Sequence, residues 1–216
     1  MTDHLTDDAT DDATDGLIEP GRDSPGERSL VLASASPRRR ELLAILISGY
    51  EVRPADIDER QGDAESPEDY VLRLAVQKAC AIAGNSPGKW VIGSDTEVVL
   101  EEKCLGKPRD EPRACDMLRS LSGRSHTVYS SVALVGPDSS VRTALSISEV
   151  RFARLPEDWI RRYAASGDPL DKAGGYAIQG QAAAWIANLD GSYSGIVGLP
   201  LFETAGLLRD AGLLQD

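Results

Sequence analysis

The chain has 216 residues, of which 41% are apolar, and its formal net charge is −12. This length allows one domain or two small lobes that share a cleft. No apolar run approaches the roughly 20 residues that a membrane helix needs. Duplex nucleic acid favours cationic surfaces, so we expect a globular protein that neither enters a membrane nor binds nucleic acid stably.

The cysteines and histidines exclude several kinds of site. The three cysteines, Cys80, Cys104 and Cys115, are scattered, without the spacing of a zinc site or a disulfide framework. This pattern suits a reducing compartment, and we expect a cytoplasmic protein. The two histidines, His4 and His126, are too few for a histidine-rich metal centre. A Ser/His/Asp triad would have to use His126, which we expect to be structural.

The first residues differ in composition from the rest of the chain. Residues 1–28 carry nine acidic and two basic side chains, a net charge of −7, whereas the remainder carries 26 acidic and 21 basic ones, a net charge of −5. The string TDDATDDATD and the Gly, Pro and Ser after it cannot bury a core, nor do they form a secretory signal. We expect residues 1–27 to be a disordered acidic tail, either a solvated leader or a regulatory contact. Residues 28–216 would form the folded domain.

The domain opens with a strand, a turn and a helix. Residues 29–33 form a short apolar run that is typical of a buried strand. Ser36 is a good helix cap and Pro37 suits the first helical position, so a helix is predicted from Pro37 until Gly49 ends it. The elements expected next are a strand over 50–54, an acidic loop over 56–59 and a helix over about 67–83.

The second half of the chain alternates between strands and helices. Residues 90–100 contain two apolar stretches, which Gly93 to Thr96 interrupt. The elements expected after them are a helix over 111–121, strands over 127–135 and 141–152, a helix over 156–164, a strand over 182–189 and a helix over 200–214. The middle strands are predicted to be antiparallel. The expected fold class is therefore α/β (α+β), with a mixed twisted central sheet flanked by helices.

The turn before the first helix carries the strongest local signal. A helix N-terminus offers free N–H groups and a partial positive charge, which together bind anions. Ser34 and Ser36 add hydroxyl groups there, and Arg38 to Arg40 add three guanidinium groups, whose planar forks match phosphate oxygens. The alternative is a capped helix with a solvated basic first turn. Cations at that end oppose the helix dipole, which favours a phosphate site with at least one of these arginines.

Lysines and carboxylates form a second signal. In GSDTEVV, Asp95 and Thr96 break an apolar run, where a carboxylate needs a metal, a lysine or hydrogen bonds; a turn that closes a hairpin is the alternative. A hairpin would bring Lys107, in LGKPRD, back toward Asp95. Lys78 lies in a mostly apolar helix, where a lysine either extends its ammonium group to water or takes part in the site. The acidic loop offers a further carboxylate, Glu59.

Two glycine-rich loops complete the candidate site. Residues 168–180, DPLDKAGGYAIQG, carry Asp171, Lys172, Tyr176 and Gln179. A glutamine amide donates and accepts hydrogen bonds, which suits the edge of a base, although an ordered surface loop is the alternative. The loop DGSYSGIVGLP either clamps a ligand or turns the chain. Neither a P-loop string nor a dinucleotide-binding GxGxxG after a strand is present.

Six strings in order resemble the Maf (septum formation protein) family of nucleotide pyrophosphatases: ASASPRRRELL, GSDTEVV, LGKPRD, LRSLSGRSH, GDPLDKAGGYAIQG and GSYSGIVGLPL. The resemblance covers residues 30–208; the departures are the tail and Gly175, where alanine is common. It implies two lobes with a cleft, as in inosine triphosphate pyrophosphatases, and a homodimer. The DKAGxYxIQG form is similar to members that hydrolyse dTTP and UTP, or modified pyrimidine nucleotides, to the monophosphate and diphosphate. The alternatives are a 7-methyl-GTP pyrophosphatase and a non-catalytic nucleotide-binding regulator of cell division.

The resemblance also implies roles for eight residues. Asp95 matches the family's proton acceptor, and Arg38, Thr96 and Gln179 resemble its specificity set. Glu59 and Asp95 would hold Mg²⁺ or Mn²⁺, because oxygen ligands without His or Cys suit these cations. Water would then attack the α-phosphorus of a nucleoside triphosphate. The expected catalytic residues are Asp95, Glu59, Lys78 and Lys107, and the expected substrate-binding residues are Ser36, Arg38, Thr96 and Gln179.

Overall fold

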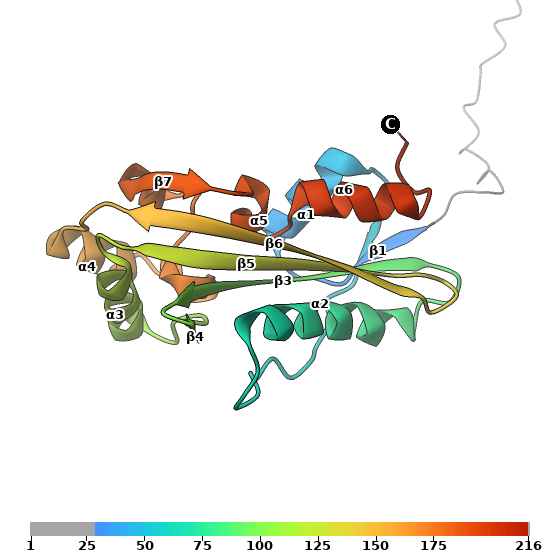
Figure 1. Cartoon of the computed structure of the whole chain (residues 1–216), viewed down its shortest axis with the longest axis horizontal. Coiled ribbons are helices and arrows are strands. Elements are labelled where there is room, and N and C mark those ends of the chain that lie inside the picture. The colour runs from blue at the N-terminus through green and yellow to red at the C-terminus, as the bar shows by residue number, and fades with distance from the viewer. Residues whose placement is uncertain (1–28, 216) are drawn as a thin grey trace, which may run out of the picture.

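The computed structural model describes residues 29–215, and the expected tail over 1–27 lies outside them. Within this part of the chain, seven strands form one sheet in the order β2-β1-β3-β5-β6-β7, with β4 paired to β3 beside this path (Figure 1). The strands are β1 (Leu30–Leu32), β2 (Glu51–Val52), β3 (Trp90–Leu100), β4 (Lys103–Cys104), β5 (Ser125–Val135), β6 (Val141–Phe152) and β7 (Ile186–Asp190). The β1 strand runs parallel to β2 and β3, and the other pairs are antiparallel. The predicted mixed sheet is confirmed.

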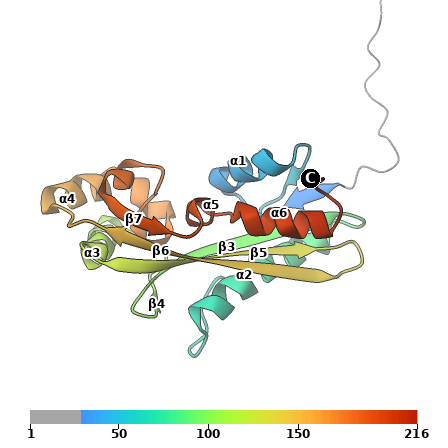
Figure 2. The ribbon, with the colours of Figure 1, turned by 45° about the horizontal axis from the view of Figure 1, so that its top comes forward.

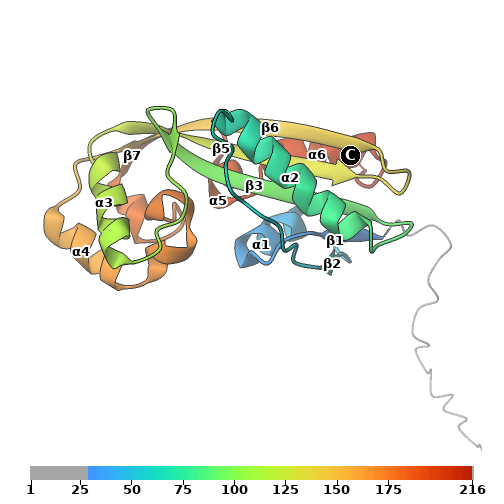
Figure 3. The same ribbon diagram turned by 90° about the horizontal axis from the view of Figure 1, so that it is seen from below.

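Helices cover both faces of the sheet. Helix α2 (Pro67–Ala83) lies on one face, whereas α1 (Pro37–Leu46), α5 (Tyr193–Val197) and α6 (Leu201–Asp210) lie on the other (Figures 1 and 2). At the far end of the long strands gather α3 (Glu111–Leu121), α4 (Glu157–Ala165) and the 3₁₀ segments η1 (Asp168–Asp171), η2 (Ala173–Gly175) and η3 (Gln181–Trp185) (Figure 3). None of the described helices is long and apolar enough to cross a bilayer.

The apolar core lies on both sides of the sheet. The larger cluster packs the sheet against the helices opposite α2 and those at the far end, and its fully buried side chains include Leu32, Leu43, Leu118, Phe152 and Tyr163. The smaller cluster lies beneath α2 and includes Val31, Ala75, Ala79, Val91 and Ala133. Fully burying a large apolar side chain contributes about 1.5–3 kcal/mol, so these clusters fix the helices against the sheet.

A glycine in β3 lets α2 approach the sheet closely. A Cβ atom added to Gly93 would lie 2.2 Å from the carbonyl oxygen of Ala75 and 2.7 Å from the backbone nitrogen of Ala79. Only a residue without a side chain fits against backbone atoms at these distances. Lys78 lies on the same buried face of α2 as these two alanines. The close packing therefore brings a lysine against the middle of β3.

The predicted interruption at Gly93 to Thr96 is wrong, because β3 runs unbroken from Trp90 to Leu100. Asp95 and Thr96 pair with Ser131 and Ser130 of β5 in the ladder. Their polar side chains are accommodated because they have partners on neighbouring elements. The predicted hairpin exists, but the chain reverses later, at Glu101 and Glu102, which adopt φ angles of 50° and 64°.

Other boundaries also differ from the predicted ones. Residues 181–185 form η3, so the strand expected over 182–189 is confined to β7. The loop GSYSGIVG contains helix α5, because the Ser192 side chain accepts the N–H of Gly195 at 3.0 Å and caps it. The last helix ends at Asp210 rather than 214. Short caps and turns determine where these elements begin and end, and the apolar periodicity of the sequence does not indicate them.

Candidate active site

The candidate site lies where β3 loses a strand partner. The β1 strand pairs with β3 as far as Leu32 opposite Ile92, and β4 pairs with it again only from Val99. Between these points a cavity of about 350 Å³ lies against β3. It is lined by residues of α1 and α5, which lie on one face of the sheet, and by Lys78 of α2, which lies on the other (Figure 2). The open edge is what allows side chains from both faces of the sheet to meet.

The structure brings the expected site residues together at this cavity. Seven of the eight line it directly: Ser36, Arg38, Glu59, Lys78, Thr96, Lys107 and Gln179. The eighth, Asp95, is 7% exposed and contacts the lining residue Lys78. Segments separated by more than a hundred residues thus converge on one cavity.

Lys78 joins two carboxylates. Its Nζ lies 2.6 Å from Oδ1 of Asp95 and 2.7 Å from Oε1 of Glu59. The side chains of Lys78 and Asp95 are each 9% exposed, whereas that of Glu59 is 46% exposed. Partial burial alone would raise the pKa of Glu59, but the hydrogen bond and charge of Lys78 hold that pKa below its ordinary value. One ammonium group therefore balances a buried and a half-exposed carboxylate.

The loop that carries Glu59 is fixed to α2 although it has no regular structure. The Tyr70 hydroxyl donates to the backbone carbonyl of Glu59 at 2.7 Å. Arg73 donates to the carbonyl of Arg60 at 3.0 Å and pairs with the Glu65 carboxylate at 2.5 Å. These bonds hold the backbone at Glu59 and at the residue after it, so the Glu59 carboxylate is presented to the cavity from a defined position.

The start of α1 contributes two arginines. Arg38 Nη1 lies 3.5 Å from Oδ2 of Asp171, across the cavity from its own helix. Arg39 Nε donates to the carbonyl of Gly198 at 2.8 Å. Arg39 also lines the cavity, although no separate role was predicted for it, whereas Arg40 does not line it. Ser36 accepts the N–H of Arg39 at 3.4 Å, so its hydroxyl caps the helix.

A chain of hydroxyl groups fixes Thr96. Its Oγ1 lies 2.8 Å from Oγ of Ser130, and the Ser130 hydroxyl donates to the carbonyl of Gly195 at 2.7 Å. A serine hydroxyl has one hydrogen, so Ser130 must accept from Thr96. The Gly198 carbonyl, 3.3 Å from Thr96 Oγ1, is a second and longer acceptor for the same Thr96 hydrogen, and it also accepts from Ser94 at 3.0 Å. The Thr96 oxygen is left as a hydrogen-bond acceptor toward the cavity.

Lys107 and Gln179 reach the cavity from two different loops. Both side chains belong to exposed residues, and neither has a hydrogen bond or ion pair within the described residues. Lys172, on the same loop as Gln179, is instead bonded to Asp168 at 3.1 Å and to Asp171 at 2.7 Å. Lys107 and Gln179 are therefore the groups whose polar atoms are available to a ligand.

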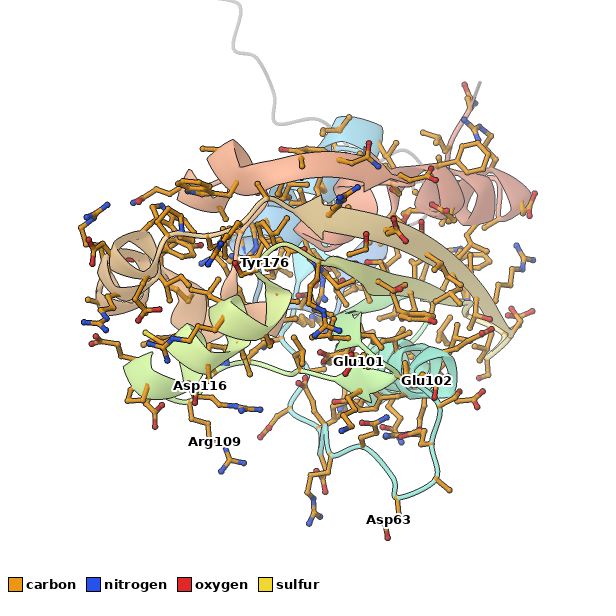
Figure 4. All side chains as sticks on the ribbon, turned by 60° about the vertical axis from the view of Figure 1, so that its left-hand side comes forward. Asp63, Glu101, Glu102, Arg109, Asp116 and Tyr176 are labelled. Atoms are coloured by element: carbon orange, nitrogen blue, oxygen red, sulfur yellow. The ribbon has the colours of Figure 1, made fainter. Side chains whose placement is uncertain are left out.

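His126 lies behind the cavity wall. It is 3% exposed, and its Nε2 lies 2.7 Å from the hydroxyl of Tyr176, which lines the cavity. Burial lowers the pKa of His126 to about 4, so the ring is neutral at pH 7. Tyr176 lies within the fold, whereas Asp63 and Arg109 point outward (Figure 4). This geometry fits the expected structural role of His126.

The donor set suits a hard divalent cation that arrives with a phosphate ligand. The carboxylates of Glu59 and Asp95 converge on one point, which Lys78 Nζ now contacts. The described residues contain no group of three or more His, Cys, Asp or Glu side chains placed to hold a metal. Mg²⁺ is usually bound through one or two carboxylates, with substrate phosphates and water as the other ligands. Two carboxylates beside an anion site fit that pattern.

The fold and the cavity together define a mixed α/β protein with a cationic cleft beside paired carboxylates. Such a site is suited to a polyphosphate. The model of the family described as Maf-like protein matches residues 29–211. The chain belongs to this family.

Relatives from several bacteria support the assignment. A protein of Myxococcus xanthus (strain DK1622) named dTTP/UTP pyrophosphatase is 52% identical over 184 residues, which cover 85% of this chain and 93% of that protein. A protein of Hahella chejuensis (strain KCTC 2396) with the same name is 48% identical over 193 residues, which cover 88% and 96%.

Solved structures show a weaker likeness. A HAM1 protein from Coxiella burnetii has a TM-score of 0.49 at 19% identity, covering 84% of this chain and 98% of that one. A nucleoside-triphosphatase, dITP/XTP pyrophosphatase, from Mycobacterium abscessus has a TM-score of 0.44 at 18% identity, covering 86% and 95%. These values are too low to inform the site.

Proposed function

We propose that this chain is a nucleoside triphosphate pyrophosphatase that hydrolyses dTTP and UTP, or modified pyrimidine nucleotides, to the monophosphate and diphosphate. The observation that carries the proposal is the contact of Lys78 with Asp95 and Glu59 at a cavity that Arg38 and Lys107 also line. Relatives named dTTP/UTP pyrophosphatase at 52% and 48% identity support it. The activity belongs to residues 28–216.

The triphosphate would lie across the start of α1, near Ser36 and Arg38, with Lys78 and Lys107 balancing its charge. Asp95 takes a proton from the water that attacks the α-phosphorus, a new P–O bond forms, and pyrophosphate leaves with the electrons of the broken P–O bond. Because the phosphoryl group carries most of the developing charge, fixed cations supply much of the catalysis. Lys78 would orient the Asp95 carboxylate through their 2.6 Å contact.

Glu59 and Asp95 are the residues that would hold Mg²⁺ or Mn²⁺. When bound, the cation would neutralise charge on the phosphate oxygens. Arg38, Thr96 and Gln179 would determine which nucleotide binds. All three line the cavity, and the free amide of Gln179 can meet donors and acceptors on a base.

The protein's surroundings are also proposals. We expect it to work in the cytoplasm, which its three unpaired cysteine thiols support, because such thiols suit a reducing compartment. We expect a homodimer on the resemblance to the family alone. Size-exclusion chromatography with light scattering would show a single species of one chain mass if the dimer is wrong.

A substrate panel tests the proposed activity. The purified full chain would be mixed with Mg²⁺ or Mn²⁺ and each common nucleoside triphosphate, and with 7-methyl-GTP, while pyrophosphate release is measured. We expect dTTP and UTP to give the fastest release, with the monophosphate as the second product. Faster release from 7-methyl-GTP would favour that alternative. Nucleotide binding without any pyrophosphate would favour the non-catalytic regulator and overturn the enzyme.

A further inference from the structure

Glu97 is a buried carboxylate that the proposed chemistry leaves unused. It is 5% exposed and lies two residues after Asp95 on β3, so the two side chains point to the same face of the strand. It forms no ion pair within the described residues, and it is not part of the cavity lining. Burying an acidic group has a large cost unless hydrogen bonds compensate for the lost water. Its position therefore needs an explanation.

The Glu97 side chain binds the backbone just before Lys107. Its Oε1 accepts the N–H of Gly106 at 2.8 Å and the N–H of Val98 at 3.0 Å. The carbonyl of Gly106 accepts the N–H of Gly174 at 2.8 Å. Both the N–H and the carbonyl of Gly106 are thus hydrogen-bonded. A short turn with φ of 64° at Gly106 gains its order from these two bonds.

The Gly174 contact ties in the second loop of the site. A Cβ atom at Gly174 would lie 2.8 Å from Cγ1 of Val98, and the residue has a φ of +67°. Segment η2 is therefore pressed against β3, and the chain continues from it to Gln179. The Glu97–Gly106–Gly174 connection joins the loop that carries Lys107 to the loop that carries Gln179.

We propose that Glu97 is a positioning residue whose carboxylate oxygen holds Gly106 and thereby directs Lys107 at the triphosphate. The inference rests on the proposed function, because Lys107 acts on phosphate only there. Glu97 itself does not touch the substrate. Losing the acceptor would free the Lys107 turn, and small displacements of a positioned group reduce turnover strongly.

Kinetic constants for three variants test the role of the oxygen. Glu97→Gln keeps an acceptor oxygen at the same reach, and we expect kcat/KM for UTP within about threefold of wild type, since a neutral acceptor bonds more weakly than a carboxylate but still holds the Gly106 N–H. Glu97→Leu removes the acceptor and Glu97→Asp withdraws it, and we expect losses of about 10- to 100-fold in both. Equal losses in Glu97→Gln and Glu97→Leu would overturn the proposal.

A matched control separates positioning from general loss of a buried polar group. Thr204 is 0% exposed, and its hydroxyl donates to the carbonyl of Pro200 at 2.7 Å in α6, away from the cavity lining. We expect Thr204→Val to keep wild-type kcat/KM. A loss in Thr204→Val as large as in Glu97→Leu would assign the effect to stability and contradict the inference.

A double variant shows whether Glu97 acts through Lys107. Adding Glu97→Leu to Lys107→Ala should cause little further loss, because the group being positioned is already absent. If the two losses multiply, Glu97 acts by another route and the proposal is wrong.

Hydrogen exchange of the Gly106 amide, followed by NMR without nucleotide, tests the contact independently of catalysis. We expect faster exchange in Glu97→Leu and Glu97→Asp and wild-type exchange in Glu97→Gln. Unchanged protection of Gly106 in Glu97→Leu would overturn the positioning role whatever the kinetics show. Absence of pyrophosphate release from the wild-type chain would instead refute the proposed function, so the two failures are distinguishable.

Discussion

Two clusters of charged side chains have similar geometry in very different surroundings. At the cavity, Lys78 lies 2.6 Å and 2.7 Å from two carboxylates, and its side chain is 9% exposed. At the far end of the sheet, Glu157 lies 2.7 Å from Arg119 and 2.9 Å from Arg161, and its side chain is 43% exposed. The second cluster links α3 to α4 in contact with water, where such pairs contribute little.

The difference shows where this fold tolerates a costly arrangement. Removing charged groups from water is unfavourable by several kcal/mol for each ion, and an opposite charge only partly compensates for this. Stability alone does not explain why Lys78 and Asp95 are buried, since apolar residues would serve the core as well. Their position beside an open cavity does explain it. Four substitutions sharpen this contrast.

The largest effect is expected for Lys78→Met. The variant leaves the buried Asp95 carboxylate without its cation, and removing one partner of a buried pair typically destabilises by about 3–5 kcal/mol. Urea unfolding would measure the change. The double variant Lys78→Met, Asp95→Leu should regain part of the loss, because no unpaired charge remains. A double variant less stable than Lys78→Met would contradict this explanation.

Asp95→Asn should fold but lose activity. The amide keeps the shape of the side chain but cannot accept the proton from water, so we expect kcat to fall by roughly 10²-fold or more. Pyrophosphate release with UTP measures the loss. The matched control is Asp63→Asn, at an exposed residue that points outward (Figure 4), and it should retain wild-type kcat. Near-normal turnover in Asp95→Asn would remove Asp95 from the role of base.

Ser130→Ala should alter selectivity more than turnover. Without Ser130, the Thr96 hydroxyl keeps only the Gly198 carbonyl, 3.3 Å away, as an acceptor, so its hydrogen is freer to turn and donate toward the cavity. Uracil presents an N–H at the ring position where cytosine presents an acceptor, so we expect the preference in kcat/KM for UTP over CTP to fall about three- to tenfold. Ser131→Ala is the matched control, because that hydroxyl donates to the carbonyl of Val71 at 2.6 Å. An equal change of preference in both variants would count against the hydroxyl chain.

The smallest effect is expected for Glu157→Gln. Water and salt screen its two arginine contacts, so the melting temperature and kcat should stay within error of wild type. Differential scanning calorimetry at low and high salt would measure the melting temperature. A loss comparable to that of Lys78→Met would mean that burial does not distinguish the two clusters.

Part of the candidate site could be predicted from the residues alone. Ser36 and Arg38 stood at a helix start, whose surroundings favoured an anion, and a hairpin was expected to bring Lys107 toward Asp95. The full set of site residues came from the resemblance to the Maf family. The close approach at Gly93 and the Thr96–Ser130 pair depend on which strands become neighbours, and no local pattern specifies that. The contact of Glu97 could not be predicted for the same reason, since its partner Gly106 lies across the hairpin.

Hydrolysis in H₂¹⁸O tests the central claim most directly. If water attacks the α-phosphorus beside Asp95, mass spectrometry of the products from UTP should find ¹⁸O in the monophosphate and none in pyrophosphate. Label in pyrophosphate, or products of UDP and phosphate, would contradict it.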